Sequence, residues 1–507
     1  MVEIDRIACL ASEEFTAQSY AEVVELMQRV EAAIQKDDTV KMQAEKELIR
    51  ILQTTPMNDM CFIFYVSILW NVFLREDYLA LLLESALESK MLHVEHLQYL
   101  HYQVSHSLFN RPEYRTEKIG ILEKRLYSQI MEELKGAVDI HPKSKELRNY
   151  KNVVVITPVM LGENHAPTHS LLERSYMLAK LFDANVSIIS AKEGIFKRGS
   201  VPYYHVASAN CIKENDSRRT YLYKDKEFDF YQGEKTLDTI EGLQELVDYV
   251  ENVNPYYIVY VGGQSYVAEL LNAFCPVLTI STVFSTIPDS NTTFAMVGRQ
   301  ITEEERRKHS SEILEVPFSF ELTEKKRDYT REELGIPMQA FVMAVVGNRL
   351  DYDVKDEFLE KMGQLAQGFF LFIGSFATYE EKKRKYPWLE TRSVSLGRVE
   401  DVMGILGCAD LYVNPKRLGG GFSVIEAFHA GMPAVSLDYG DVAAAAGEDF
   451  CVRDYDEMLE TIRKYQSDGA FYQEMLGKAL AREREMTNGE SAFKDAIEKM
   501  LHSDRFY

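Results

Sequence analysis

The sequence predicts an α/β protein in which two Rossmann-like units, each a doubly wound parallel sheet, follow an all-helical domain. Three observations carry this prediction. Residues 1 to about 145 place apolar side chains at helical spacing, with little Gly or Pro between them. From Lys151 onward, short β-branched runs alternate with amphipathic helical stretches. The alternation starts again after a charged stretch at about 320–334, and a chain of 507 residues has room for two to four domains.

The first domain is expected to hold five or six helices. Ala21–Ile34 has apolar residues on one helical face, and the other predicted helices lie at about 41–53, 60–75, 77–89, 92–108 and 114–136. We find no clean repeat period, so a regular helical-repeat array is not supported. The most apolar run, Cys61–Leu74, is too short to span a bilayer and predicts a buried helix.

The first α/β unit begins with Asn152-Val-Val-Val-Ile-Thr-Pro, which is typical of a buried parallel strand. Further strands are expected at 184–190, 256–261 and 276–281, with helices at 168–182, 239–253 and 264–274.

The charged stretch at 320–334 predicts a connection with one short helix, followed by the second α/β unit. Its strands are expected at 341–346, 368–373, 392–396, 410–414, 433–437 and 449–452. Its helices are expected at 354–367, 399–407, 421–431, 455–467 and 470–483, with a last helix at 490–502. We therefore predict domains at 1–148, 149–325 and 326–490, and a C-terminal helix in 491–507 that packs back on the core.

The amino-acid composition and net charge argue against several classes of function. The formal charge is −22. The resulting negative field repels phosphate groups, so general nucleic-acid binding and docking on an anionic membrane are disfavoured. Six cysteines are scattered without a Cys-x-x-Cys pair, as in a reduced cytosolic protein. The first residues lack a basic region followed by an apolar one, so no signal peptide is expected. We expect a cytoplasmic protein without a transmembrane segment.

The strongest chemical signal is the string Asn414-Pro-Lys-Arg-Leu-Gly-Gly-Gly-Phe-Ser-Val-Ile-Glu-Ala-Phe-His-Ala-Gly-Met-Pro433. Three glycines between a strand end and a helix start allow close approach of the backbone to a ligand. The amides of the new helix then suit a diphosphate, and Glu426, one turn in, suits a ribose diol. The alternative is a merely structural turn, but the full string favours a ligand site.

A second string, Val345-Val-Gly-Asn-Arg-Leu-Asp-Tyr-Asp-Val-Lys355, also follows a strand. It offers Arg349 and Lys355 at a strand's carboxyl end, where open α/β sheets bind ligands and where both bases suit a phosphate. The alternative is surface charge, with Lys355 paired to Asp351. On this string alone the two readings weigh evenly.

Two Asp-x-Asp pairs, at 351–353 and 454–456, would suit a metal-bound nucleotide, but both precede helices. We favour helix capping, with Asp353 as one cap.

In the first α/β unit, the loop after the first strand carries Glu163 and His165, which are candidates to position or deprotonate an acceptor hydroxyl. Thr168 and Ser170 are equally plain capping residues. A metal held by His165 and His169 is disfavoured without a third ligand. Gly262–Ser265 lies at another strand–helix junction, which is more often just a turn.

Together, the 345–355 string, Leu396-Gly397-Arg398-Val399 and the 414–433 string resemble the donor-binding half of GT-B glycosyltransferases, in particular the family-4 type that uses nucleotide sugars. The ordered matches cover about 340–455. A helical domain in front of such a core is similar to that of some bacterial protein-glycosylating enzymes, by analogy.

The resemblance implies specific roles. Arg349 and Lys355 match the basic pair that neutralises the donor diphosphate, and Glu426 matches the second glutamate of the Glu-x7-Glu motif. The first glutamate is replaced by Leu418, which affects the family's sugar contacts and stereochemistry. The expected donor-binding residues are Asn348, Arg349, Lys355, Val399, Lys416, Arg417, Gly420, Gly421, Phe422, Ser423 and Glu426. The expected catalytic residues are His165, Glu163, Arg349 and Lys355.

The sequence thus predicts a glycosyltransferase that moves a sugar from a nucleotide sugar, expected to be a UDP-sugar, with retention and without a metal or other cofactor. The expected acceptor is a bacterial protein or a glycan, and homo-oligomerisation stays open. The alternatives are a non-catalytic partner of an active transferase and a sugar-nucleotide epimerase. Deletion of 1–145 is expected to abolish transfer to protein and to spare donor hydrolysis.

Overall fold

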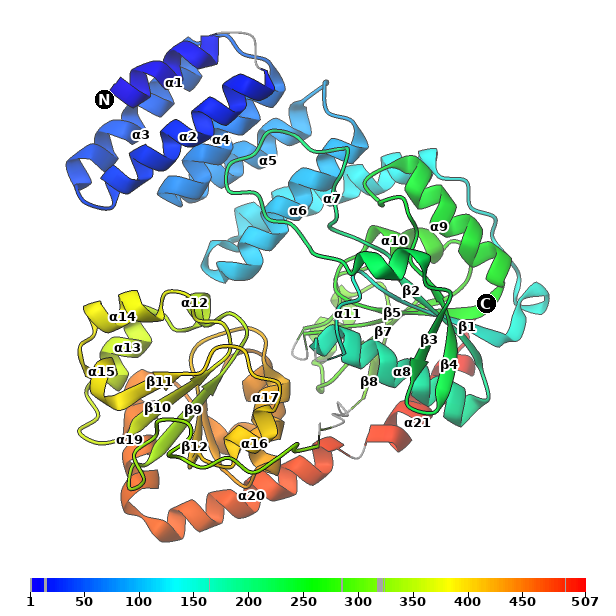
Figure 1. Cartoon of the computed structure of the whole chain (residues 1–507). Helices are drawn as coiled ribbons and strands as arrows, with labels where there is room; N and C mark the ends of the chain where they lie inside the picture. The colour runs from blue at the N-terminus through cyan, green and yellow to red at the C-terminus, as the bar shows by residue number, and fades with distance from the viewer. Residues whose placement is uncertain are drawn as a thin grey trace. The chain divides into compact units, whose positions relative to one another are not determined.

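The computed structural model describes residues 2–12, 16–163, 165–283, 286–316, 322, 324–487 and 489–507. The chain forms two compact units. One comprises Met1–Lys143, Ile156–Gly162 and Ser187–Pro255; the other comprises Ser144–Val155, Glu163–Val186 and Tyr256–Tyr507. Figure 1 shows the helices and strands of both.

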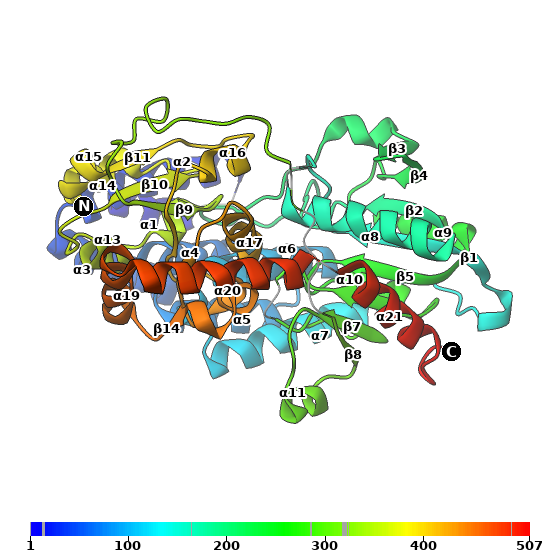
Figure 2. The same ribbon diagram turned by 90° about the horizontal axis from the view of Figure 1, so that it is seen from below.

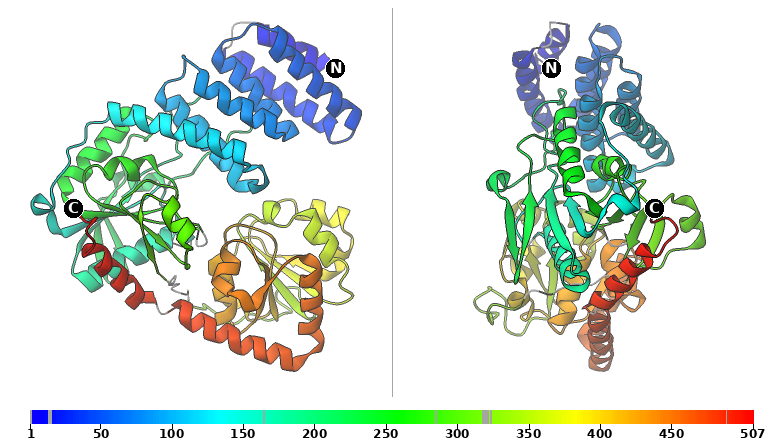
Figure 3. Two further views of the ribbon diagram at one scale, coloured as in Figure 1. Left: turned by 180° about the vertical axis from the view of Figure 1, so that it is seen from behind. Right: turned by 90° about the vertical axis from the view of Figure 1, so that its right-hand side faces the viewer.

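The N-terminal part of the first unit is all helical, as predicted. Figure 3 shows its helices as neighbouring rods. The described residues form α1 Val2–Ser12, α2 Ala17–Ile34, α3 Asp38–Thr54, α4 Asp59–Phe73, α5 Glu76–Glu88, α6 Val94–Asn110 and α7 Glu117–Ala137. The prediction of five or six helices missed α1, which has 11 residues and is packed against α2 and α3. So short a helix depends on tertiary packing more than on its own pattern.

Helix α4 is the predicted buried helix. Asn58 caps it by accepting a hydrogen bond from the Cys61 amide at 2.9 Å, and Leu74 ends it in the left-handed conformation. Apolar side chains are buried all round it, among them Phe64 and Trp70, so α4 is the core of this domain. Across the part of the chain that the structure describes, no helix is long and apolar enough to cross a membrane.

The helical domain holds the main chain of the long loop after β2 (Asn185–Ser190). Asn71 on α4 donates to the Tyr204 carbonyl at 2.9 Å. The Gln103 amide on α6 donates to the Ala207 carbonyl and accepts from the Ala207 amide, both at 2.8 Å. The helical domain therefore holds this loop through hydrogen bonds to its backbone groups.

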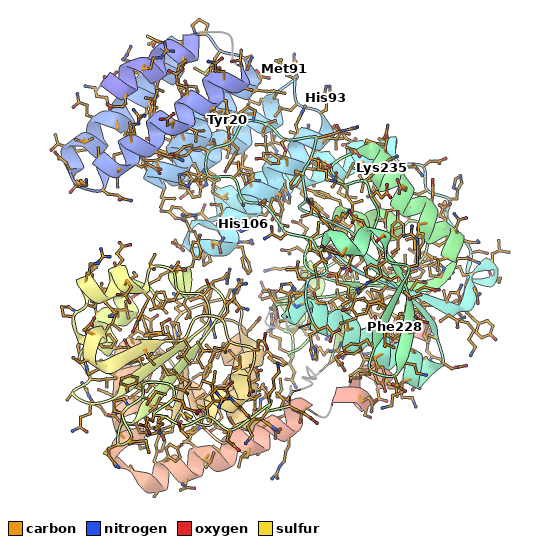
Figure 4. All side chains as sticks on the ribbon, viewed as in Figure 1. Tyr20, Met91, His93, His106, Phe228 and Lys235 are labelled. Atoms are coloured by element: carbon orange, nitrogen blue, oxygen red, sulfur yellow. The ribbon has the colours of Figure 1, made fainter. Side chains whose placement is uncertain are left out.

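Aromatic burial reinforces this attachment. Tyr203 and Tyr204 are at most 2% exposed, and the Phe196 ring meets that of Tyr99 edge to face at 5.1 Å. The hydroxyl of Tyr20, labelled in Figure 4, donates to the Tyr203 carbonyl at 3.1 Å. Because these rings are core residues, the loop and the helices fold as one body.

The first sheet has eight strands in the order β3-β4-β2-β1-β5-β6-β7-β8. The predicted strands correspond to β1 Asn149–Thr157, β2, β5 Pro255–Val261 and β6 Val277–Ile280. The prediction missed β3 Thr220–Tyr223, β4 Lys226–Tyr231, β7 Phe294–Val297 and β8 Glu312–Glu315. The pairs β2–β4, β5–β6, β6–β7 and β7–β8 are parallel, and only the β3–β4 hairpin among the registered pairs is antiparallel. The accompanying helices are α8 Ala166–Phe182, α9 Ile240–Val253, α10 Tyr266–Leu271 and α11 Glu303–Lys308.

The second sheet has six parallel strands in the order β11-β10-β9-β12-β13-β14. They are β9 Val342–Val346, β10 Phe369–Ile373, β11 Ser393–Ser395, β12 Leu411–Asn414, β13 Ala434–Leu437 and β14 Cys451–Val452, each within two residues of the prediction at either end. The helices between them are α12 Leu350–Asp353, α13 Asp356–Met362, α14 Tyr379–Lys385, α15 Trp388–Arg392, α16 Val402–Leu406, α17 Gly421–His429, α18 Gly440–Ala446 and α19 Tyr455–Ser467. The central strands are buried throughout because helices cover both faces.

The short helix expected in 320–334 is wrong for the residues described there. Residues 324–330 have no regular structure and 331–335 form turns. Arg331 ties this connection to the second sheet by pairing with Asp410 at 2.8 Å. The charged pattern that suggested a helix instead serves contacts of this kind.

The chain ends in two helices, α20 Gly469–Thr487 and α21 Gly489–Leu501. Helix α20 lies along α17 and α19 (Figure 2). Helix α21 contacts β8, and its Phe493 ring lies 4.7 Å under the Arg174 guanidinium of α8. Phe506, 3% exposed, follows α21 and packs against Tyr256 of β5 at 5.1 Å.

Candidate functional site

The second sheet has the strand order of a dinucleotide-binding fold, which reverses between β9 and β12. Tyr412 of β12 pairs with Ala344 of β9, so these strands are neighbours although β10 and β11 lie between them in sequence. Ligands of open α/β sheets bind outside the carboxyl ends of the strands at such a reversal. The two motif strings follow these two strands, so the fold brings both to the predicted edge.

The Gly-rich loop leads directly into α17. Gly420 is the N-cap residue with a φ of 109°, a left-handed conformation that a side chain would strain. Gly421 and Phe422 then open the helix, whose first amides have no intrahelical partners and carry the positive end of its dipole. The predicted helix start at Phe422 is confirmed within one residue, and it has the form of an anion site.

Glu426 lies one turn into α17 and is 7% exposed. Burial raises the pKa of its carboxyl to about 8. None of the residues that the structure describes forms a hydrogen bond or an ion pair with this carboxyl group. A buried carboxyl without protein donors is suited to receive hydroxyl donors from a ligand.

Arg349 and Lys355 flank α12 beyond the end of β9. Arg349 is the residue before the helix, with one third of its side chain exposed, and Lys355 precedes α13 and is exposed. Asp353 lies between them in sequence and pairs with the Arg349 guanidinium at 3.9 Å. The pairing of Lys355 with Asp351 that surface charge alone would favour is not formed; Asp351 accepts from Thr378 instead.

Arg417 is placed differently from expectation. Its side chain is 4% exposed, and its guanidinium donates to Asn414 Oδ1 and Tyr412 Oη, both at 2.7 Å. It also donates to Ser423 Oγ at 3.2 Å. Its Nε and Nη2 atoms are therefore engaged beneath the loop, while Nη1 lies 3.7 Å from Asp353 Oδ2. Direct contact of Arg417 with the donor stays a prediction.

The remaining predicted donor residues lie at the same edge. Lys416 is exposed, with its ammonium 5.4 Å from the Tyr439 ring. The Ser423 hydroxyl is engaged by Tyr412 at 2.7 Å and by the Gly420 carbonyl at 2.7 Å. The others differ in exposure: Asn348 is exposed, while Val399 and Phe422 are half-buried.

Leu418, which replaces the expected glutamate, meets the turn after β13. Its carbonyl accepts from the Asp441 amide at 2.6 Å. Asp441 is 4% exposed, and its carboxylate lies 3.9 Å from where a Cβ of Gly419 would stand. An acidic group is therefore present beside the loop, supplied by another element.

The two Asp-x-Asp pairs differ in whether they cap a helix. Asp454 caps α19 by accepting from the amides of Asp456 and Glu457, which confirms capping there. Asp353 is not a cap; it ends α12 and pairs with two arginines because it is buried beside them. Among the described residues, no group of three or more His, Cys, Asp or Glu side chains is arranged to hold a metal ion.

In the first sheet the strand order reverses between β1 and β5, and the loop with Glu163 and His165 follows β1. His165 is the residue before α8, and its Nδ1 lies 3.2 Å from Thr168 Oγ1. Burial lowers the pKa of His165, which favours the neutral imidazole, the form that can accept a proton. Glu163 is exposed in the preceding turn. In the 262–265 segment, Ser265 caps α10, which supports the plain-turn reading.

Sequence reasoning missed the polar network beneath the loop. Tyr412 and Asn414 are on β12 and look like ordinary strand residues, and Asp353 looks like a cap. The one sequence feature that indicates this network is Asn414, at the end of a buried strand and three residues before Arg417. It is weak because only the fold shows that the two side chains point the same way.

The comparisons with known proteins agree with this geometry. Residues 340–468 match the family model described as glycosyl transferases group 1. A mutant of the Thermobaculum terrenum O-GlcNAc transferase superposes with a TM-score of 0.56 over 99% of this chain and 96% of that one, at 12% identity. A glycosyltransferase from Rickettsia africae ESF-5 superposes with a TM-score of 0.50 over 70% of this chain and 98% of that one, at 10% identity. A search of the curated proteins gave no match.

Proposed function

We propose that this protein is a glycosyltransferase that uses a nucleotide sugar, with a UDP-sugar as donor and a protein as acceptor. Two findings support the proposal: residues 340–468 match the glycosyl transferases group 1 family model, and the chain has the GT-B fold. We propose further that it acts in the cytoplasm without a metal or other cofactor, and with retention of the anomeric configuration. A glycan acceptor is the rival.

One observation carries the donor assignment. The reversal point of the second sheet combines an α17 N-terminus behind Gly420, the bases Arg349 and Lys355, and the buried carboxyl of Glu426. Amides and bases suit a diphosphate, and a carboxyl group without protein donors suits a ribose diol.

The chemistry follows from charge. As the bond from sugar to diphosphate breaks, negative charge grows on the departing phosphate oxygens. Arg349, Lys355 and the first amides of α17 are fixed before the reaction begins, so they stabilise that charge without reorganising. A divalent ion would duplicate this role, which supports metal-independent transfer.

The acceptor side rests on the first sheet and the helical domain. The neutral imidazole of His165 is our candidate to take the acceptor proton, with Glu163 beside it in sequence. We propose a protein acceptor because an all-helical domain, α1 to α7, precedes the two sheets and offers a surface for a large partner.

The test is a panel of nucleotide sugars with EDTA present, followed by calorimetry and release of the nucleoside diphosphate. We expect tight binding and slow release of UDP from one sugar. If no nucleotide sugar or diphosphate binds, the proposal that the protein is an enzyme is overturned. A non-catalytic partner of an active transferase is then favoured, an alternative that the replacement of the glutamate by Leu418 permits. Release abolished by EDTA would overturn metal independence.

Removal of one base tests the diphosphate site. Arg349→Ala is expected to lower donor turnover about 100-fold or more, as loss of one preorganised donor does elsewhere. The matched control is Arg463→Ala, an exposed arginine on α19 near the opposite end of that helix from the strand carboxyl ends. Turnover in both variants is measured as UDP release. Normal turnover in Arg349→Ala would place the diphosphate elsewhere.

A further inference from the structure

The buried guanidinium of Arg417 touches both strand-end loops of the donor site. On one side, a Cβ added to Gly420 would stand 2.7 Å from Arg417 Cζ. On the other side, a Cβ added to Gly347, the residue after β9, would stand 2.4 Å from Arg417 Nη1. Real Cβ atoms do not approach so closely, so the two glycines leave room for one arginine between the loops.

Asp353 balances this arginine. Its carboxylate is 9% exposed and lies 3.7 Å from Arg417 Nη1. The same carboxylate lies 3.9 Å from Arg349 Nη2 on the other side. Burial raises the pKa of Asp353, and the two guanidinium groups oppose that rise. One carboxylate is thus shared by a buried arginine and by an arginine that reaches the surface.

We propose that Asp353 is a positioning residue that holds Arg349 for the donor diphosphate, and that Arg417 couples Asp353 to the Gly-rich loop. The chain of contacts runs from Ser423 through Arg417 and Asp353 to Arg349, and so from α17 to the end of β9. This inference rests on the proposed function, because Arg349 is taken to contact a diphosphate. A plain buried ion pair is the competing explanation, in which Asp353 only neutralises Arg417.

The experiment is a double-mutant cycle on UDP affinity, measured by calorimetry with the full chain. GDP and ADP replace UDP if it does not bind. The variants are Asp353→Asn, Arg349→Ala and the double variant. If Asp353 acts through Arg349, Asp353→Asn alone weakens binding about tenfold, and Arg349→Ala alone about 100-fold. In the Arg349→Ala background, Asp353→Asn then adds less than about twofold.

Asp351→Asn is the matched control. Asp351 is on the same short helix and anchors the loop at Thr378, without an ion pair to Arg349 among the contacts described. Any effect that it has on affinity through loosening of α12 is expected to multiply with that of Arg349→Ala. The thermal midpoint of every variant is recorded, so that loss of folded protein is not mistaken for weak binding.

The outcomes separate the two levels of inference. Wild-type protein that binds none of the three diphosphates overturns the proposed donor site and the positioning role with it. Wild-type binding together with independent effects of Asp353→Asn and Arg349→Ala overturns the positioning role alone and leaves the donor site standing. Coupling for Asp353, with independence for Asp351, supports both.

Discussion

At the scale of single residues, the carboxyl group of Glu426 determines how donor binding responds to pH. Its pKa of about 8 lies above the ordinary value of 4.5, so the carboxyl group is mostly protonated at pH 7 in the empty site. Ribose hydroxyl groups donate best to the ionised form. Donor affinity is therefore expected to rise with pH up to about 8, by at most about tenfold per pH unit, and then to level off.

The measurement compares wild type and Glu426→Gln in UDP affinity between pH 6.5 and 8.5. The glutamine variant removes the titrating group, so the difference between the two profiles also cancels ionisation of the phosphate itself. A wild-type profile parallel to that of Glu426→Gln would mean that this carboxyl group does not meet the ligand.

The same proton affects stability with the opposite sign. Between pH 4.5 and 8 the folded protein keeps a proton on Glu426 that the unfolded chain has lost. The contribution of this group to stability therefore falls as pH rises through that window. Alkaline conditions favour the ligand and disfavour the empty fold.

At the scale of elements, the loop after β2 changes the meaning of a domain deletion. The sequence predicts that removal of 1–145 spares donor hydrolysis. The structure shows that this deletion would uncover Tyr203 and Tyr204 and leave the main chain at 204–207 without its partners. We now expect the truncated protein to be insoluble or strongly destabilised.

A point variant tests the attachment more cleanly. Gln103→Ala removes both hydrogen bonds to Ala207, from a side chain that is only 2% exposed. It is expected to lower the free energy of unfolding by about 1–3 kcal/mol, because the backbone groups of the loop lose their partners. Urea unfolding measures this. The exposed Gln28→Ala on α2 is the control, with an expected change within about 0.5 kcal/mol.

The sequence predicted the elements of the second sheet well and those of the first sheet less completely. Buried parallel strands such as β9 read as continuous apolar runs between glycines, which is a strong local signal. The β3–β4 hairpin alternates exposed and buried residues at the sheet edge, and β7 and β8 have four residues each. Their strand form depends on neighbours far away in sequence, so local pattern was insufficient.

The position of the candidate site could be predicted from the sequence, but not which of its side chains are buried beneath the loops. Glycines and bases after strands identify an edge of the sheet, and strand order then explains why β9 and β12 share it. Whether an arginine faces a ligand or lies beneath a loop depends on packing. The sequence therefore predicts Arg417 as a ligand residue and Asp353 as a cap, and the structure places the two side chains in one buried pair.

At the scale of the whole molecule, the last residues support the first sheet although they follow the second. Phe506 is buried against Tyr256, and Arg148 lies 5.4 Å from the Phe506 ring. Phe506→Ala is expected to destabilise the fold by about 3–5 kcal/mol, the usual result for an aromatic core residue. Tyr507→Ala, at a residue that is 65% exposed, is the control with little expected effect.

The readout is the urea midpoint together with UDP affinity at 25 °C. Affinity is expected to be unchanged in both variants, because the donor residues follow strands of the other sheet. A weaker affinity in Phe506→Ala alone would show that the C-terminal residues act on the donor site as well as on stability.

The close packing of Arg417 against Gly347 and Gly420 predicts how these three positions vary among related chains. The three positions are 70 and three residues apart, yet a side chain at either glycine would displace the arginine. They should therefore vary together. In a set of relatives, chains that carry a larger residue at the position of Gly347 or Gly420 should lack the arginine. This co-variation would identify the buried contact of Arg417 with both loops without another structure.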